Sequence, residues 1–291
     1  MFYLLTLLSG ACFVLLGFSY KLASARGCRA MPFAASFLAT AMLLAAGRAL
    51  CEPTQWADPR LWLLGVFNGV MLFVALTLVV LANRLGPASV SWMIVNLSLL
   101  IPIMLAAMTL GEGFVPNDLL LLVAFALMLT ALRHGVADEQ GGRAAPAFWP
   151  LLGALYITNG LFQYGCKVKE AWFHGANTGG LAMIYFGTGM LLALAAHAAR
   201  GGGRFRRAEL LTGIQAGLFA GLGNQLQLGA MSLPAIVVYP LGQGISLTGG
   251  VALTALLYHE KLTRGKVIGF VLSLVVLLLA VLREPIARWL G

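Results

Sequence analysis

The second half of this 291-residue chain repeats the first half at a nearly constant offset of 148 residues. Residues 39–45 read ATAMLLA, and residues 187–193 read GTGMLLA. The same offset aligns Gly65 with Gly213, Gly69 with Gly217, Ala82 with Ala230, Val90 with Val238, Ser98 with Ser246 and Glu112 with Glu260. The offset drifts by about two residues toward either end of the chain, as loop insertions produce. The chain is therefore expected to fold as two copies of one structural unit.

The composition places this unit in a membrane. Hydrophobic residues make up 60% of the chain and charged residues only 10%, whereas a soluble domain carries about 25% charged residues. A membrane-spanning helix needs about 20 apolar residues. Ten such segments are predicted, at about 2–20, 31–50, 61–82, 86–109, 118–133, 148–166, 176–198, 210–230, 234–257 and 266–282.

An odd number of spans in each copy reverses the second copy relative to the first. We therefore expect an all-α integral membrane protein of ten transmembrane helices, arranged as two inverted five-helix repeats. The first repeat covers residues 1–135 and a linker loop covers 136–147. The second repeat covers 148–284 and a short tail covers 285–291. Because residues 148–166 repeat the first segment, we expect that segment to be a retained span rather than a signal peptide.

The net charge of +9 does not indicate nucleic-acid binding, because no basic cluster falls on a soluble fold. Most basic residues lie in the odd-numbered loops, which favours a cytoplasmic location for those loops and an external one for both termini. The four cysteines show neither metal-ligand spacing nor a disulfide framework. We expect no cofactor and no metal.

All ten carboxylates fall at predicted span ends or in loops, so none is placed to relay protons or cations at the membrane midplane. A facilitator or exchanger fits this pattern, and the substrate is not expected to be a bare cation. The motifs GxSxG, GxxxxGK[ST] and HExxH are absent. His134 and Asp138 form only a weak acid/base pair in a charged loop, so the chain is not expected to be an enzyme.

Uncharged polar residues recur at helical spacing inside several spans. Such groups must face protein or water, because an unpaired one is costly in lipid. The predicted substrate contacts are Asn96, Tyr156, Asn159, Gln163, Asn224, Gln225, Tyr239, Gln243 and Ser246. The alternative for each is an ordinary hydrogen bond between helices, worth about 0.6 kcal/mol.

Proline marks an expected helix break in each repeat, at Pro102 and at Pro240. Such breaks in both halves are typical of transporter binding sites. Trp92 aligns with Pro240 and is a candidate for the cavity mouth. Glu112 and Glu260 are expected to be capping carboxylates, with gating as the alternative.

These features resemble the drug/metabolite transporter superfamily, and in particular its ten-span EamA-like permeases, over 1–135 and 148–284. The resemblance is carried by Lys21 and Lys167, by RLGPASV and MSLPAIV at the entries to spans 4 and 9, and by GEGFV and HEKLT after those spans. The first span lacks the tryptophan–glycine pair common in the family, and the first turn lacks its Leu-Thr. The resemblance implies a cavity lined by spans 1, 3, 4, 6, 8 and 9, with both termini in the cytoplasm. Members of this family export or import amino acids, nucleosides, sugar derivatives and drugs.

The sequence thus predicts a secondary transporter that moves a small neutral or zwitterionic metabolite or drug by alternating access, as an exporter or exchanger. Its expected location is the bacterial cytoplasmic (inner) membrane, and its expected partners are a small-molecule substrate and the lipid bilayer. No nucleic acid is expected, and the chain is expected to be a monomer or a homodimer. Two alternatives stay open: an integral membrane enzyme acting on lipid-linked substrates, and a non-transporting membrane scaffold.

Overall fold

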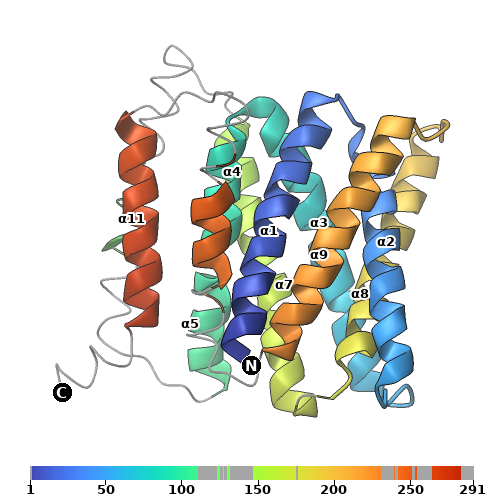
Figure 1. Ribbon diagram of the computed structural model, residues 1–291. Coiled ribbons are helices and arrows are strands. Elements are labelled where there is room, and N and C mark those ends of the chain that lie inside the picture. Colours follow the sequence, from blue (N-terminus) through green and yellow to red (C-terminus); the bar gives the residue numbers. More distant parts are fainter. Residues whose placement is uncertain are drawn as a thin grey trace.

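The computed structural model describes residues 2–110, 123–124, 127, 130–131, 147–174, 176–230, 239, 242–250, 253 and 264–282. All regular structure in these residues is helical, and they contain no strand, so the predicted all-α class is confirmed for the described part (Figure 1). Most of predicted span 5, part of span 9, both termini and the linker loop lie outside it. Pro240, Glu112, Glu260, His134 and Asp138 lie outside it as well.

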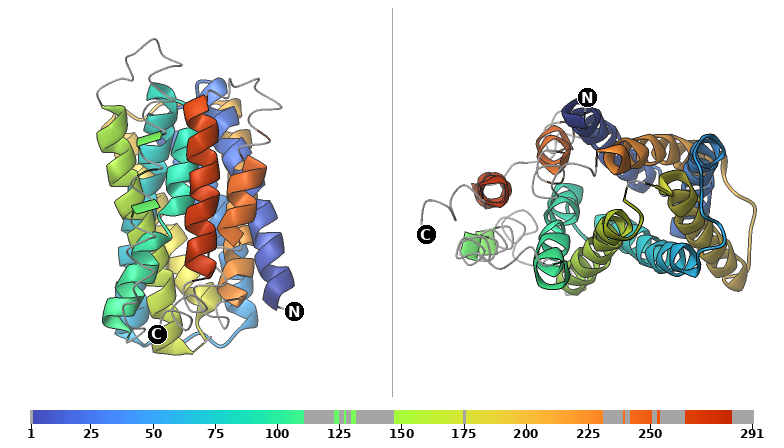
Figure 2. Two further views of the ribbon diagram at one scale, coloured as in Figure 1. Left: turned by 90° about the vertical axis from the view of Figure 1, so that its left-hand side faces the viewer. Right: turned by 90° about the horizontal axis from the view of Figure 1, so that it is seen from below.

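Each described helix overlaps one of the predicted spans. They are α1 (Phe2–Ala25), α2 (Ala30–Cys51), α3 (Pro59–Leu85), α4 (Ala88–Leu97), α5 (Leu100–Thr109), α7 (Phe148–Phe173), α8 (Thr178–Ala199), α9 (Arg207–Gly229) and α11 (Arg264–Val281). Residues 242–250 form a further helical stretch. Seen along the helix axes, α11 stands at the periphery, away from α2 and α8 (Figure 2).

Within the described residues, five segments are long and apolar enough to cross a membrane: α1, α2, α3, α8 and residues 90–109. Helices α7 and α9 have 26 and 23 residues, but they carry the amide-rich stretches and are less apolar. Large apolar side chains are exposed on the outside of the bundle, among them Leu50 at 89% and Leu63 at 69%. An apolar outer surface of this kind suits lipid better than water.

Helices α2 and α8, which correspond in the two halves, run antiparallel: a Cβ added at Gly179, near the start of α8, would meet the backbone of Ala49 near the end of α2, and one added at Gly189 would meet Leu38. Helix α1 begins beside the end of α9, where the Ser9 hydroxyl donates to the Gly223 carbonyl over 2.7 Å. In the same way, helix α7 begins beside the end of α3, where Phe148 packs against Gly86. The packing partners correspond as well: α1 lies on α9 as α7 lies on α3, α2 lies on α9 as α8 lies on α3, and α2 packs against α8.

The aligned glycines make equivalent contacts in the two halves. A Cβ added at Gly65 of α3 would stand 2.8 Å from the Cβ of Ile184 on α8, and one added at Gly213 of α9 would stand 2.8 Å from the Cβ of Ser36 on α2. Ser36 and Ile184 are themselves 148 residues apart. One turn later the same arrangement recurs, with Gly69 against Thr188 and Gly217 against Thr40. The repeated sequence therefore encodes a repeated helix–helix contact.

The predicted span 86–109 is not one continuous helix, because it breaks at Ser98 and Leu99 between α4 and α5. Pro102 has no N–H to donate to the Ser98 carbonyl four residues earlier, and its ring crowds that carbonyl. The Ser98 carbonyl instead accepts from the N–H of Ile101 over 3.1 Å. The buried Ser98 side chain lies at this break and contacts Asn159 and Gln163 of α7.

Candidate functional site

A cavity lies at the centre of the helix bundle. The space that the centre of a water molecule can reach inside it is about 90 Å³. Helices α1, α2, α3, α4, α7, α8 and α9 and the stretch 242–250 all contribute to its wall. The lining residues are Phe13, Leu16, Tyr20, Phe37, Leu72, Trp92, Val95, Asn159, Phe162, Gln163, Phe186, Ala220, Asn224, Gln227 and Gln243.

The described lining carries no charged side chain. Its polar side chains include five amides, from Asn159, Gln163, Asn224, Gln227 and Gln243, beside the Tyr20 hydroxyl and the Trp92 indole N–H. The last four of these amides are all 6–7% exposed, so they are almost completely removed from solvent. Two of the five come from the first helix of the second repeat and two from its third helix. The cavity is thus polar without being charged.

The helix break holds the α7 amides in place. The Ser98 hydroxyl accepts from Nδ2 of Asn159 over 2.6 Å and from Nε2 of Gln163 over 3.1 Å, and it donates to the Val95 carbonyl over 2.6 Å. Nδ2 of Asn159 also donates to the Val95 carbonyl over 3.1 Å. Because both amide nitrogens donate to this segment, their oxygens remain for other partners.

Two tyrosines support the amides from outside the lining. The Tyr185 hydroxyl donates to Oδ1 of Asn224. The Tyr239 hydroxyl donates to the Gln163 carbonyl over 2.9 Å. Both tyrosines are fully buried, at 0% and 1% exposure, so these bonds fix the cavity wall from within the protein core.

Two buried amide atoms at the cavity lack hydrogen-bond partners among the described residues. They are Oε1 of Gln163, an acceptor, and Nε2 of Gln227, a donor. A buried polar atom without a partner costs about 1–3 kcal/mol. Such atoms in a cavity wall are suited to a ligand or to water.

Aromatic rings form the remaining wall. The Tyr20 ring lies 6.0 Å from Trp92 and 6.2 Å from Phe37, measured between centroids. Trp92 donates its indole N–H to the Ser246 carbonyl over 3.2 Å. A Cβ at Gly250 would lie 2.5 Å from Nε1 of Trp92, so the absence of a side chain there lets the indole approach. Trp92, a candidate for the cavity mouth in the sequence analysis, is one of the lining residues.

Of the nine predicted contact residues, four line the cavity: Asn159, Gln163, Asn224 and Gln243. Three others, Asn96, Tyr239 and Ser246, are buried behind it; Nδ2 of Asn96 donates to the Trp92 carbonyl over 2.7 Å. Tyr156 is partly buried and is not in the lining. The carbonyl and Oε1 of Gln225 both accept from Arg48, over 2.9 and 3.2 Å, away from this wall.

The structure adds lining residues that the sequence analysis missed. Gln227 lies three residues after Asn224, so the two share a helix face, and this spacing was a usable signal. The aromatic residues Phe13, Phe37, Phe162 and Phe186 gave no signal, because a phenylalanine in an apolar helix is most simply a core residue.

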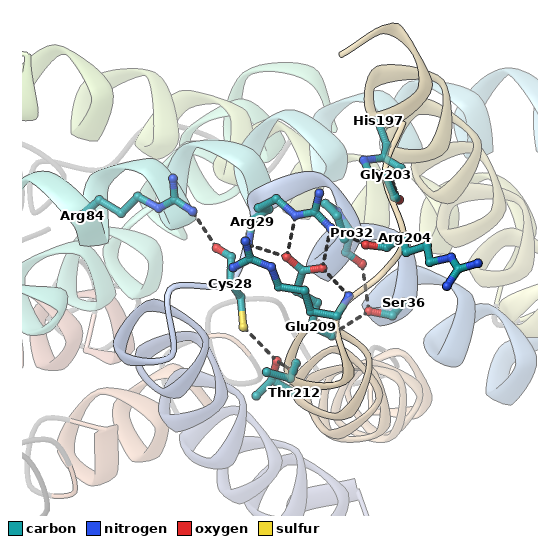
Figure 3. A network of polar contacts seen from close by, with 12 residues as sticks. Cys28, Arg29, Pro32, Ser36, Arg84, His197, Gly203, Arg204, Glu209 and Thr212 are labelled. Atoms are coloured by element: carbon teal, nitrogen blue, oxygen red, sulfur yellow. Dashed lines mark hydrogen bonds and ion pairs between the residues drawn. The ribbon is translucent and has the colours of Figure 1, made fainter. Parts of the chain in front are cut away.

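An ion-pair network closes one end of the bundle, where α2 and α9 begin (Figure 3). The Glu209 side chain is fully buried, and its carboxylate binds the Arg29 guanidinium over 2.8 Å and 3.0 Å. It also accepts from the backbone N–H groups of Arg29 and Arg206. Burial by itself would raise the pKa of Glu209, but these hydrogen bonds outweigh it and lower the pKa to about 2.

The opposite end carries a second charged cluster. Arg48 binds Glu52 over 3.2 Å, and Glu52 also accepts from the backbone N–H of Gly179. The fully buried Lys169 donates to the Thr178 hydroxyl over 2.8 Å. Among the described residues, no group of three or more His, Cys, Asp or Glu side chains is placed to hold a metal ion. The charges therefore stand at the two ends, and the neutral cavity lies between them.

No family model matches the chain, and no curated protein matches it. A solved structure described only as the crystal structure of a protein is similar to it, with a TM-score of 0.69 at 15% sequence identity and with 98% of each chain covered. At this identity the similarity shows a shared fold, and it extends over essentially the whole chain.

Proposed function

We propose that this chain is a ten-span secondary transporter of the EamA-like kind, which moves a small uncharged or zwitterionic metabolite by alternating access through the central cavity. The observation that supports the proposal is a neutral, amide-lined cavity whose wall is built by helices of both halves, between which the corresponding helices α2 and α8 pack antiparallel. A binding site between inverted repeats near the midplane is the typical design of secondary transporters.

The placement of charge supports this proposal. Ion pairs gather at the two ends of the bundle, at Glu209 and at Arg48, and the lining between them is uncharged. Opening either end would require only rearrangement of polar groups that already lie near the membrane surface. The packing of α2 against α8, and of each on the third helix of the other repeat, provides related contacts on both sides of the cavity.

Thiol accessibility tests alternating access without knowledge of the substrate. Gln227→Cys would be made in a background in which Cys12, Cys28, Cys51 and Cys166 are replaced by alanine or serine. A membrane-impermeant maleimide would then be applied to intact cells and to inverted vesicles. A transporter that exposes its cavity alternately should be labelled from both sides.

Two control variants calibrate the labelling. Leu222→Cys places a thiol on the outer surface of the same helix, where Leu222 is 46% exposed; in lipid it should resist the reagent from either side. Arg204→Cys in the exposed loop before α9 should react from one side only. Labelling of Gln227→Cys from a single side would favour a membrane enzyme with one fixed opening. No labelling from either side would favour a scaffold.

A further inference from the structure

We infer that the central cavity takes an uncharged, single-ring ligand whose edge carries both an N–H donor and a carbonyl acceptor. This inference rests on the proposed function, in which the cavity is the substrate site. It narrows the ligand to one class by excluding zwitterions and larger molecules.

The absence of charge in the wall excludes zwitterions. A zwitterion would place a carboxylate and an ammonium against a described lining that offers amides and aromatic rings but no counter-charge. A buried charge is tolerated only where it is paired and hydrogen-bonded. The charged clusters at Glu209 and Arg48 are occupied by their own ion pairs at the ends of the bundle.

The unpaired atoms define the polar edge of the ligand. The Nε2 atom of Gln163 donates to Ser98, so its Oε1 remains to accept a hydrogen bond from the ligand. Nε2 of Gln227 remains to donate one, from a different helix. A ligand with neighbouring N–H and C=O groups, such as a cyclic amide or imide, satisfies both atoms.

The rings and the size of the cavity define the body of the ligand. Aromatic residues from α1, α2, α4, α7 and α8 stand in the wall, and they favour a flat apolar face. The space open to water centres, about 90 Å³, is several times the roughly 10–15 Å³ that one water requires. Such a space suits a single six-membered ring with its substituents better than a nucleoside or a disaccharide.

Four small ring compounds separate the features of this ligand class: uracil, 1,3-dimethyluracil, orotate and phenylalanine. Uracil has the ring and the complete edge, dimethyluracil lacks the N–H donors, orotate adds a carboxylate, and phenylalanine is a zwitterion. Binding to the full-length protein in lipid nanodiscs would be measured by titration calorimetry. We expect uracil to bind, dimethyluracil to bind at least tenfold more weakly, and the two charged probes to show no measurable heat.

Two variants test whether uracil binding depends on the side-chain amide of Gln163. Gln163→Leu should weaken uracil binding at least tenfold and leave dimethyluracil binding unchanged. Oε1 of Gln163 accepts a hydrogen bond from the N–H group of uracil, and dimethyluracil has no N–H group. Gln225→Leu removes an amide from α9 outside the lining and should leave uracil binding unchanged. Thermal unfolding of each variant confirms that it is folded.

Other outcomes overturn the inference. Tighter binding of phenylalanine or orotate than of uracil, with loss in Gln163→Leu, would show that the cavity is the substrate site but takes charged ligands. Absence of binding by all four probes to the folded protein would reject the ligand class. The thiol labelling at position 227 needs no ligand, so it decides separately whether the proposed transport function also fails.

Discussion

Replacing Ser98 with alanine should destabilise the protein, although the change removes only one oxygen atom. The hydroxyl makes three hydrogen bonds, to Asn159, Gln163 and Val95. Asn159 keeps its second bond to the Val95 carbonyl, so Nε2 of Gln163 is the donor left without a partner. An unpaired buried donor costs about 1–3 kcal/mol, and the free energy of unfolding should fall by about that amount.

Ser91→Ala is the matched control, within the helix α4 that Ser98 directly follows and with the same loss of a hydroxyl. Ser91 is fully buried, and its Oγ has no hydrogen-bond partner among the described residues. Its removal should be neutral or stabilising, because a desolvated hydroxyl is lost and no bond is broken. Unfolding in mixed micelles titrated with sodium dodecyl sulfate, followed by circular dichroism, gives both values. Equal effects of the two substitutions, within about 0.5 kcal/mol, would refute the role given to Ser98.

Two further predictions concern the ends and the helix contacts. The pKa of Glu209 is about 2 in the folded state, below its usual value of 4.5, so its stabilising effect is complete above about pH 4.5 and disappears as the pH falls through 2. Unfolding measured between pH 5 and pH 2 should therefore show a steeper loss of stability for the natural protein than for Glu209→Gln, and identical slopes would contradict this account. Gly69→Ala would place a methyl 2.6 Å from the Cβ of Thr188 and should cost about 1–3 kcal/mol through overpacking. Gly47→Ala meets nothing within 4 Å and should stabilise α2 by up to about 1 kcal/mol, so a loss of stability in this variant would count against the packing described.

The repeat was the part of the fold that the sequence predicted best. The alignments of Gly65 with Gly213 and of Gly69 with Gly217 needed only the offset, and the contacts at these positions match in the two halves. The sequence could not predict that α2 packs against α8, because the repeat shows which residues correspond in the two halves but not which surfaces of the halves touch. Pro102 indicated that a helix break would occur near it, but the repeat alone does not place the break at Ser98.

The site was predicted in part. Helical spacing selected Asn159 and Gln163 correctly, and among the amides of α9 the same rule favours Asn224 with Gln227 over Gln225, which lies on another face and binds Arg48. Tyr156 shares the sequence stripe but not the cavity, because a wall between several helices uses only part of each face. The phenylalanines of the wall were not predictable, since the same residue type fills the core throughout the bundle.

The proline at position 102 makes the two repeats chemically unequal at one corresponding point. Gly250 occupies the aligned position and keeps its N–H, and residues 242–250 form an uninterrupted helix through Ser246. The second repeat can therefore break and remake the backbone hydrogen bond that the N–H of Gly250 donates within its helix. The first repeat has no such bond, because Pro102 has no N–H. In the proposed transport cycle the two repeats therefore cannot fully exchange conformations, because only the second repeat has a backbone hydrogen bond to break and remake at this level. The outward-facing and inward-facing states of such a cycle would differ in energy for this reason.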